Sequence, residues 1–307
     1  MHTLWRGNAN AWECDELGHL NVRFYLAKAA EAVGALAQMI AMPGAFDSRA
    51  TATLAARSMV VRFLAEVPPG APLAIRGGVI KHDDTCLTAA LVLDHCALER
   101  PAAAFTVELD HYAPHSGHAF PWSSRTREAL NELAVEPPAD INPRSLDTGP
   151  PEAGVSLARA EQLGLEAVGR GMINPEEVDA FGRMRVEFAF GKISSSVVHL
   201  QTGFPEQWAA FRDSAPLTAA SAVLEARLNF HRFPRAGTGY VVRTGLSRVS
   251  DKVRTLVHWV LDPATGAPLW TMEAVGCLMD LENRRLKPAD EETRARMQAA
   301  VIDGLRA

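Results

Sequence analysis

The chain has 307 residues, of which 48% are apolar and 22% charged, and its formal net charge is −5. This composition is typical of a globular protein with two ordinary domains, and the acidic balance gives no reason to expect a nucleic-acid partner. The first residues lack the basic and apolar regions of a secretory signal, and the most apolar helical segment, 29–42, is too short to span a bilayer. We therefore expect a cytoplasmic protein with no membrane partner.

The first half of the chain shows one apolar helical segment and then four strand-like stretches. Residues 21–39 are rich in alanine and leucine, which is typical of a helix wrapped by other structure. Residues 102–111 alternate apolar and polar side chains, as expected of a strand with one buried face. The predicted strands are 58–66, 73–81, 85–97 and 102–111, with a further strand before the helix and a polar helix, 123–133, at the end.

Residues 134–154 contain five prolines and two glycines and have no clear periodicity. They are predicted to link two domains, 1–133 and 155–307.

The second half repeats the order of the first. A helix is predicted over 186–200 and a polar helix over 289–305, and Asp262 to Gly266 has the composition of a hairpin turn. The predicted strands are 222–231, 240–249, 253–261 and 269–281. Periodicity alone therefore predicts an α+β fold with antiparallel sheet.

The two halves also share a segment at one fixed offset. Over residues 10–36, nine of 27 positions are identical to the residue 164 positions later. The identical pairs are Asn10/Asn174, Glu13/Glu177, Asp15/Asp179, Gly18/Gly182, Val22/Val186, Phe24/Phe188, Lys28/Lys192, Val33/Val197 and Leu36/Leu200. This pattern indicates an internal duplication.

The first copy carries the motif D-x-x-G-H-x-N-x-x-x-Y from Asp15 to Tyr25. With the helix and strands that follow, it resembles the hot-dog-fold acyl-CoA thioesterases of the 4-hydroxybenzoyl-CoA thioesterase-like superfamily. The resemblance implies a tandem double hot-dog, in which each half is a long central helix wrapped by a curved antiparallel sheet. The two halves would form an intramolecular pseudo-dimer, and this pseudo-dimer could assemble into a larger homo-oligomer. It also implies that Asp15 is the catalytic carboxylate and that coenzyme A enters as part of the substrate, with no separate cofactor.

The motif has the groups that thioester hydrolysis requires. The amide groups at the start of the helix, from Asn21 through Val22 to Arg23, are candidates for polarising the carbonyl, and Gly18 lets a ligand approach the backbone. Asp15 could activate water or attack directly to form a mixed anhydride, and the sequence does not separate these routes. His19 and Asn21 are assigned supporting roles. The alternative for Asp15 is a carboxylate that only caps the helix.

The second copy has lost three motif residues, because Arg183, Arg185 and Ala189 replace the histidine, asparagine and tyrosine. Asp179 is therefore only a possible second catalytic residue. The two arginines could bind the phosphates of coenzyme A or an acyl carboxylate. Alternatively, they pair with neighbouring acidic residues such as Glu176, Glu177 or Glu187 in a site that has lost its activity.

Other candidates are weaker. Glu31 on the predicted helix is a second possible carboxylate, and Cys14 lies beside Asp15 without an assignable histidine partner. The four cysteines lack the spacing of a zinc site, and Pro114 and Gly117 break the cluster of His111, His115 and His118, so no metal site is expected. The chain contains no G-x-S-x-G, P-loop or dinucleotide fingerprint.

The sequence thus predicts an acyl-CoA thioesterase. Two alternatives remain open, namely a non-catalytic acyl-CoA-binding protein and a hot-dog hydratase or dehydratase that acts on acyl thioesters. The acyl chain and the choice between coenzyme A and acyl carrier protein cannot be read from the sequence.

Overall fold

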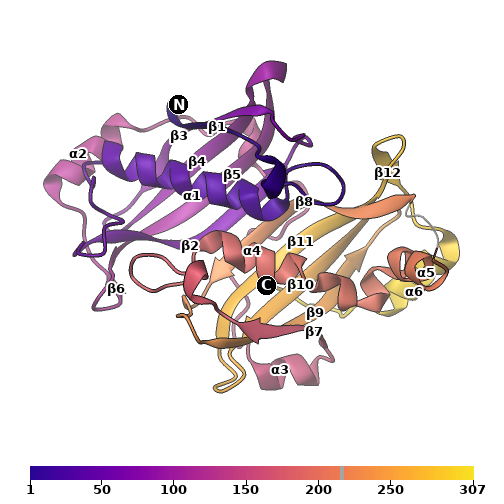
Figure 1. Ribbon diagram of the computed structural model, residues 1–307. Coiled ribbons are helices and arrows are strands. Elements are labelled where there is room, and N and C mark those ends of the chain that lie inside the picture. Colours follow the sequence, from indigo (N-terminus) through magenta and orange to yellow (C-terminus); the bar gives the residue numbers. More distant parts are fainter. Residues whose placement is uncertain (215–217) are drawn as a thin grey trace. The chain divides into compact units, whose positions relative to one another are not determined.

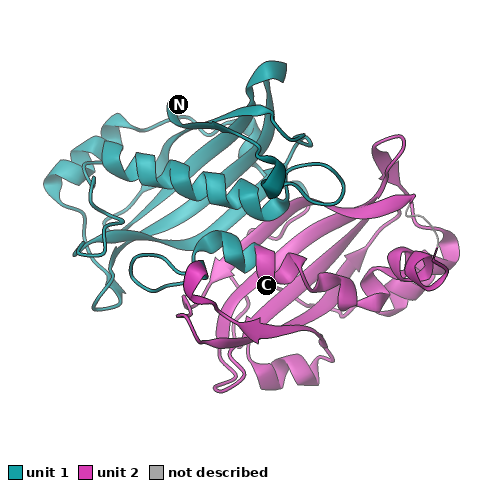
Figure 2. Cartoon of the chain, viewed as in Figure 1, with its two compact units in different colours: residues 1–144, 177–190 teal, residues 145–176, 191–307 magenta. Residues whose placement is uncertain are grey.

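The computed structural model describes residues 1–214 and 218–307 and divides them into two compact units (Figures 1 and 2). Unit 1 contains Met1–Arg144 and Glu177–Phe190, and unit 2 contains Ser145–Glu176 and Gly191–Ala307. The second copy of the motif thus belongs to unit 1. The boundaries 1–133 and 155–307 describe sequence repeats rather than these units, and they stay a prediction.

Unit 1 contains an antiparallel sheet in the order β1-β3-β4-β5-β2. The strands are β1 His2–Asn8, β2 Thr53–Phe63, β3 Pro72–His82, β4 Cys86–His95 and β5 Arg100–Ala113, with a short β6, His118–Ala119, paired to the end of β5. The side chains of Phe105, Val107 and Leu109 in β5 are buried, whereas those between them are partly exposed. The predicted strands, including the one before the helix, are confirmed to within a few residues at most ends.

Helix α1, Val22–Met39, lies across this sheet and contacts β1, β3 and β4 (Figure 1). Leu26, Ala29, Ala32 and Leu36 on its inner face are fully buried. Small alanines let the helix approach the strands closely, and each buried leucine contributes about 1.5–3 kcal/mol. The predicted helix 21–39 is confirmed, and the polar helix that closes the half is α2, Ser124–Glu132.

Unit 2 contains an antiparallel sheet in the order β8-β11-β10-β9-β7. Its strands are β7 Glu166–Met172, β8 Ala219–Phe230, β9 Gly239–Val249, β10 Val253–Leu261 and β11 Pro268–Asp280, and the short β12, Arg285–Lys287, pairs with β11. Gly266 adopts a φ of 71° and donates its N–H to Asp262 O at 2.8 Å, so the predicted hairpin turn is confirmed. The closing helix is α6, Glu291–Ala299.

The helix of the second repeat, α4, is shorter than predicted, because it covers Val186–Ser194 and does not reach Leu200. The hydroxyl groups of Ser195 and Ser196 both donate to the Lys192 carbonyl, at 3.1 and 2.9 Å. Serine hydroxyls that bond to nearby carbonyls compete with the helical pattern. Two 3₁₀ turns and a further helix, α5, Pro205–Arg212, follow, and α3, Leu157–Gln162, precedes β7; the sequence predicted neither α3 nor α5.

The predicted linker is held to the strands on each side. Ile141, in a 3₁₀ turn, packs with Ala90, Val92 and Ala104 of unit 1. Within unit 2, Arg227 of β8 donates to the carbonyl of Asp147 at 2.9 Å. None of the helices in residues 1–214 and 218–307 combines the length and apolar character needed to cross a bilayer.

Candidate functional site

The loop before α1 forms a tight turn around Asp15. Asp15 donates its N–H to His19 O at 3.0 Å, and Gly18 donates its N–H to Asp15 O at 3.0 Å. Gly18 adopts a φ of 77°, which favours glycine, and a Cβ built there would meet no atom within 4 Å. Main-chain hydrogen bonds therefore close the turn, and the space beside the Cα of Gly18 is open.

Asn21, and not Asp15, caps α1. The Asn21 side chain accepts the N–H of Arg23 at 3.1 Å, as the N-cap residue of a helix does. The Asp15 carboxylate instead accepts the N–H of Leu17 at 3.0 Å through Oδ1, and its Oδ2 lies 3.3 Å from His19 Nδ1. The geometry thus contradicts the alternative in which Asp15 only caps the helix.

His19 lies between two carboxylates. Its Nδ1 faces Asp15, and its Nε2 lies 3.7 Å from Glu66 Oε1. Burial raises the pKa of Asp15, but hydrogen bonds from the His19 side chain and from the amides of Leu17 and His19 outweigh burial, so its pKa is lowered. Asp15 is therefore ionised at neutral pH.

Glu66 was missed by the sequence analysis, which placed it only at the end of a predicted strand. Two contacts bring its segment to the motif. The Tyr25 hydroxyl donates to Ala65 O at 3.2 Å, and Leu20 donates its N–H to Val67 O at 2.8 Å. Glu66 lies between these anchored residues. Because Glu66 lies far from the motif in the sequence, no local pattern could predict that the two come together.

The N-terminus of α1 offers fewer free amides than predicted. Asn21 N–H donates to Glu13 O at 2.9 Å, Gly18 N–H donates to Asp15 O, and Arg23 N–H is bonded to Asn21. Val22 is the first residue of the helix, so its N–H has no intrahelical acceptor. Of the amides proposed from the sequence, that of Val22 is the best candidate for polarising a carbonyl.

The Arg23 side chain extends over aromatic rings. Its guanidinium lies 3.9 Å from the centroid of Phe188 and 5.1 Å from that of Phe24. Burial and the neighbouring Arg185 lower the pKa of Arg23, whereas Glu187 and Glu177 oppose this shift. Arg23 thus stays a cation, because even a lowered arginine pKa lies far above neutral pH.

The second copy has the same loop with a different side-chain arrangement. Asp179 donates its N–H to Arg183 O at 2.7 Å, Gly182 donates to Asp179 O at 2.9 Å with a φ of 74°, and Arg185 donates to Glu177 O at 2.9 Å. These three bonds match Asp15 to His19, Gly18 to Asp15 and Asn21 to Glu13 in the first copy. The main chain of the loop is therefore the same in both copies.

The Asp179 carboxylate is fully engaged. Its Oδ2 accepts Arg183 Nε and Nη2 at 3.0 and 2.8 Å, and its Oδ1 accepts the amides of Phe181 and Arg183 at 2.9 Å. Each of the two carboxylate oxygens thus already accepts two donors, which leaves little room for a further bond to water or to a substrate. Arg185 pairs with Glu187 at 3.1 Å. Both arginines thus pair with acidic residues, which favours a site that has lost its activity over a phosphate site.

Glu31 and Cys14 have structural contacts. Glu31 is exposed and accepts the indole N–H of Trp5 at 2.8 Å. Burial, together with the charges of Asp15 and Glu13, raises the pKa of the Cys14 thiol, which disfavours the nucleophilic thiolate.

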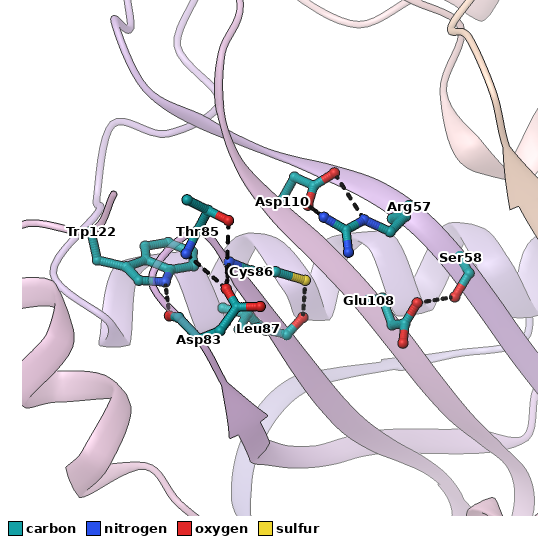
Figure 3. Close-up of polar contacts among 9 residues, drawn as sticks. All are labelled: Arg57, Ser58, Asp83, Thr85, Cys86, Leu87, Glu108, Asp110 and Trp122. Carbon is teal, nitrogen blue, oxygen red and sulfur yellow. Dashed lines mark hydrogen bonds and ion pairs between the residues drawn. The ribbon is translucent and has the colours of Figure 1, made fainter. Parts of the chain in front are cut away.

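A second polar cluster lies on β2, β4 and β5 of unit 1 (Figure 3). Ser58 Oγ donates to Glu108 Oε2 at 2.8 Å, and Arg57 pairs with Asp110. Cys86 lies near these groups, but burial raises the pKa of its thiol to about 11. These contacts are cross-strand pairs, which stabilise the sheet.

The histidine cluster is dispersed. His111 is buried, its Nδ1 lies 2.8 Å from Phe120 O, and its ring stacks on Trp122. His115 lies in the turn between β5 and β6, His118 is the first residue of β6, and both side chains are exposed. Within the described residues, no group of three or more potential ligands could hold a metal ion.

Comparisons with known proteins agree with this fold. A family model described as the Thioesterase-like superfamily matches residues 9–130 and 173–297, so each matched segment contains one copy of the motif. A search of curated protein sequences finds no match. The 12:0-ACP thioesterase from Umbellularia californica is a similar solved structure, with a TM-score of 0.66 and 8% identity over 89% of this chain and 93% of that chain. The acyl-ACP thioesterase from Bacteroides thetaiotaomicron has a TM-score of 0.61 and 8% identity, over 89% of this chain and 96% of that chain.

At this identity the two solved structures show the likeness of fold alone, whereas the family model covers most of the chain. The resemblance stated from the sequence is thereby confirmed, and it supports the assignment of the protein as a thioester hydrolase. The chain belongs to the Thioesterase-like superfamily.

Proposed function

We propose that the protein hydrolyses an acyl-CoA thioester to a carboxylic acid and coenzyme A, with Asp15 as the catalytic carboxylate. One observation carries this proposal. The ionised Asp15 carboxylate directs Oδ2 toward His19 beside the N-terminus of a helix that Asn21 already caps. Asp15 is thus available for chemistry in a way that Asp179, bound by Arg183, is not.

Two routes use this carboxylate. As a general base, Asp15 takes a proton from water, the hydroxide adds to the thioester carbon, and the thiolate leaves and is protonated. As a nucleophile, Asp15 adds to the same carbon and expels the thiolate, and water then hydrolyses the mixed anhydride. His19, whose two ring nitrogens face Asp15 and Glu66, has a supporting role in either route, because it orients the Asp15 carboxylate. The Val22 amide would stabilise the negative charge on the carbonyl oxygen.

The substrate is taken to be an acyl-CoA, because the motif resembles acyl-CoA thioesterases. The two similar solved structures are named for acyl-ACP substrates, so acyl carrier protein thioesters are the second substrate to test. We further propose the tandem double hot-dog, with domains 1–133 and 155–307 acting as a pseudo-dimer. No separate cofactor is invoked.

The test is thiol release from a panel of acyl-CoA and acyl-ACP substrates. Asp15→Asn should lower kcat by about 100-fold or more, because it removes the base or nucleophile without changing shape. Asp179→Asn is the matched control, since it makes the same change in the same loop of the second copy, and it should cost much less turnover. Near-wild-type turnover by a folded Asp15→Asn variant would refute the role of Asp15. A larger loss at Asp179 would move the active site to the second copy.

A further inference from the structure

A buried ion pair joins the loop that carries Asp15 to the middle of α1. Lys28 Nζ lies 2.9 Å from Glu13 Oε1 and 2.8 Å from Glu13 Oε2, and the lysine side chain is only 3% exposed. The Trp5 ring of β1 covers the ammonium group, with its centroid 5.1 Å from Nζ. The carboxylate and the aromatic face together compensate a charge that burial would otherwise disfavour.

Glu13 also holds the main chain at both ends of the loop. Its carboxylate accepts the N–H of Asn10 at 2.9 Å, which closes the 3₁₀ turn Ala11–Glu13. Its carbonyl accepts the N–H of Asn21, the N-cap residue of α1, at 2.9 Å. Glu13 is therefore attached to the start of α1 through its main chain. Its side chain is attached to Lys28, about two turns further along the helix.

Two anchors about 10 Å apart along a helix fix the angle of the loop between them, whereas a single anchor lets the loop pivot. We propose that the Glu13–Lys28 ion pair is a positioning device that sets the direction from which Asp15 meets the acyl carbonyl. This inference rests on the proposed thioesterase function. It names Glu13 and Lys28 as positioning residues, which act on the reaction only through Asp15.

The internal duplication supports this role. The second copy repeats both residues, as Glu177 and Lys192, although it has lost the histidine, asparagine and tyrosine of the motif. The main-chain bonds of the loop are also the same in both copies. The pair therefore belongs to the frame that holds the loop, and not to the groups that react.

The double variant Glu13→Gln/Lys28→Met tests the proposal, because it removes both charges together and leaves no unpaired buried charge. It should lower kcat by about 10- to 100-fold and leave KM within about twofold, since the loop shifts while the substrate surface is unchanged. Hydrogen exchange at the Asn21 amide should become about tenfold faster or more. The control is Arg76→Met/Asp94→Asn, which removes an ion pair of 2.7 Å between β3 and β4 and should leave kcat unchanged.

The outcomes separate this inference from the proposed function. If the wild type releases no thiol, or Asp15→Asn releases it as fast as the wild type, the proposed function fails. If Asp15→Asn is inactive while the double variant has wild-type kcat and wild-type exchange at Asn21, the positioning role is overturned. If the double variant does not fold, Lys28→Arg is tested instead, because it retains the positive charge and changes its position relative to Glu13. A lower kcat at unchanged KM then supports the proposal, and a wild-type kcat overturns it.

Discussion

The Tyr25 hydroxyl ties the segment that carries Glu66 to the motif through Ala65, and Tyr25→Phe removes only this hydrogen bond. The ring packs edge-on against Phe63, with centroids 5.2 Å apart and planes at 87°, and this packing is retained in the variant. Burial raises the pKa of Tyr25, so the hydroxyl is neutral and donates to Ala65 O at 3.2 Å. A neutral hydrogen bond contributes about 1 kcal/mol net, and an acceptor left unpaired in the interior costs about 1–3 kcal/mol.

Ala65 is partly exposed, so water can replace the lost donor, and the smaller figure applies. Tyr25→Phe should therefore reduce the free energy of unfolding by about 1 kcal/mol in a urea titration. It should also lower kcat by about tenfold, because residues 65–67 then lose one of the two hydrogen bonds that anchor their main chain to the motif, and Glu66 moves away from His19. Loss of stability with wild-type kcat would show that Glu66 does not support His19. A loss above about 3 kcal/mol would show that the hydroxyl has partners beyond Ala65.

Three further predictions concern the loop, the second copy and unit 2. Gly18→Ala should cost about 1–2 kcal/mol of stability, because a φ of 77° disfavours a Cβ, and it should lower kcat in the thiol-release assay. Gly182→Ala, at a φ of 74°, should cost a similar amount of stability and leave kcat unchanged. Replacing both Arg183 and Arg185 with glutamine should leave KM and its salt dependence nearly unchanged, whereas a higher, less salt-sensitive KM would restore the phosphate-binding interpretation. Burial lowers the pKa of His258 to about 3 from 6.5, so the unfolded state binds the extra proton and stability should fall as the pH drops from about 6.5 toward 3. Urea titrations at several pH values should show that the free energy of unfolding depends on pH more steeply in the wild type than in His258→Phe, by up to about 1.4 kcal/mol per pH unit. An equal pH dependence in both proteins would show that the pKa of His258 is not lowered.

Local patterns in the sequence predicted the elements that depend on local physics. The alternation in β5, the alanine-rich face of α1 and the turn at Gly266 are each specified by neighbouring residues, and the structure has all three. The start of α1 was also predicted correctly, because Asn21 is a good N-cap residue. The early end of α4 was missed because the apolar pattern continues past Ser194, while the serine hydroxyls compete for the helix carbonyls.

The candidate site was predictable only in its contiguous part. Asp15, Gly18, His19 and Asn21 lie in one loop, so a motif could reveal them. Glu66 reaches His19 through contacts between residues distant in sequence, and Lys28 was identified only as a position shared by the two repeats. The partner of Arg183 was also not predicted, because the sequence suggested Glu176, Glu177 or Glu187, whereas Nε and Nη2 of Arg183 both donate to Asp179 Oδ2. Pairing of this kind depends on loop conformation, which the spacing of charges does not specify.

The shared backbone of the two loops bears on how the duplicated chain can evolve. The same three main-chain bonds close the turn around Asp15 and around Asp179, so the turn does not depend on the histidine, asparagine or tyrosine of the motif. The same turn can therefore hold either a carboxylate that faces His19 or one that forms a salt bridge with Arg183. By the same reasoning, Arg183→His, Arg185→Asn and Ala189→Tyr are the shortest mutational route to a second working loop. If the proposed role of Asp15 holds, the chain contains in one molecule both the working loop and a control loop with the same main chain.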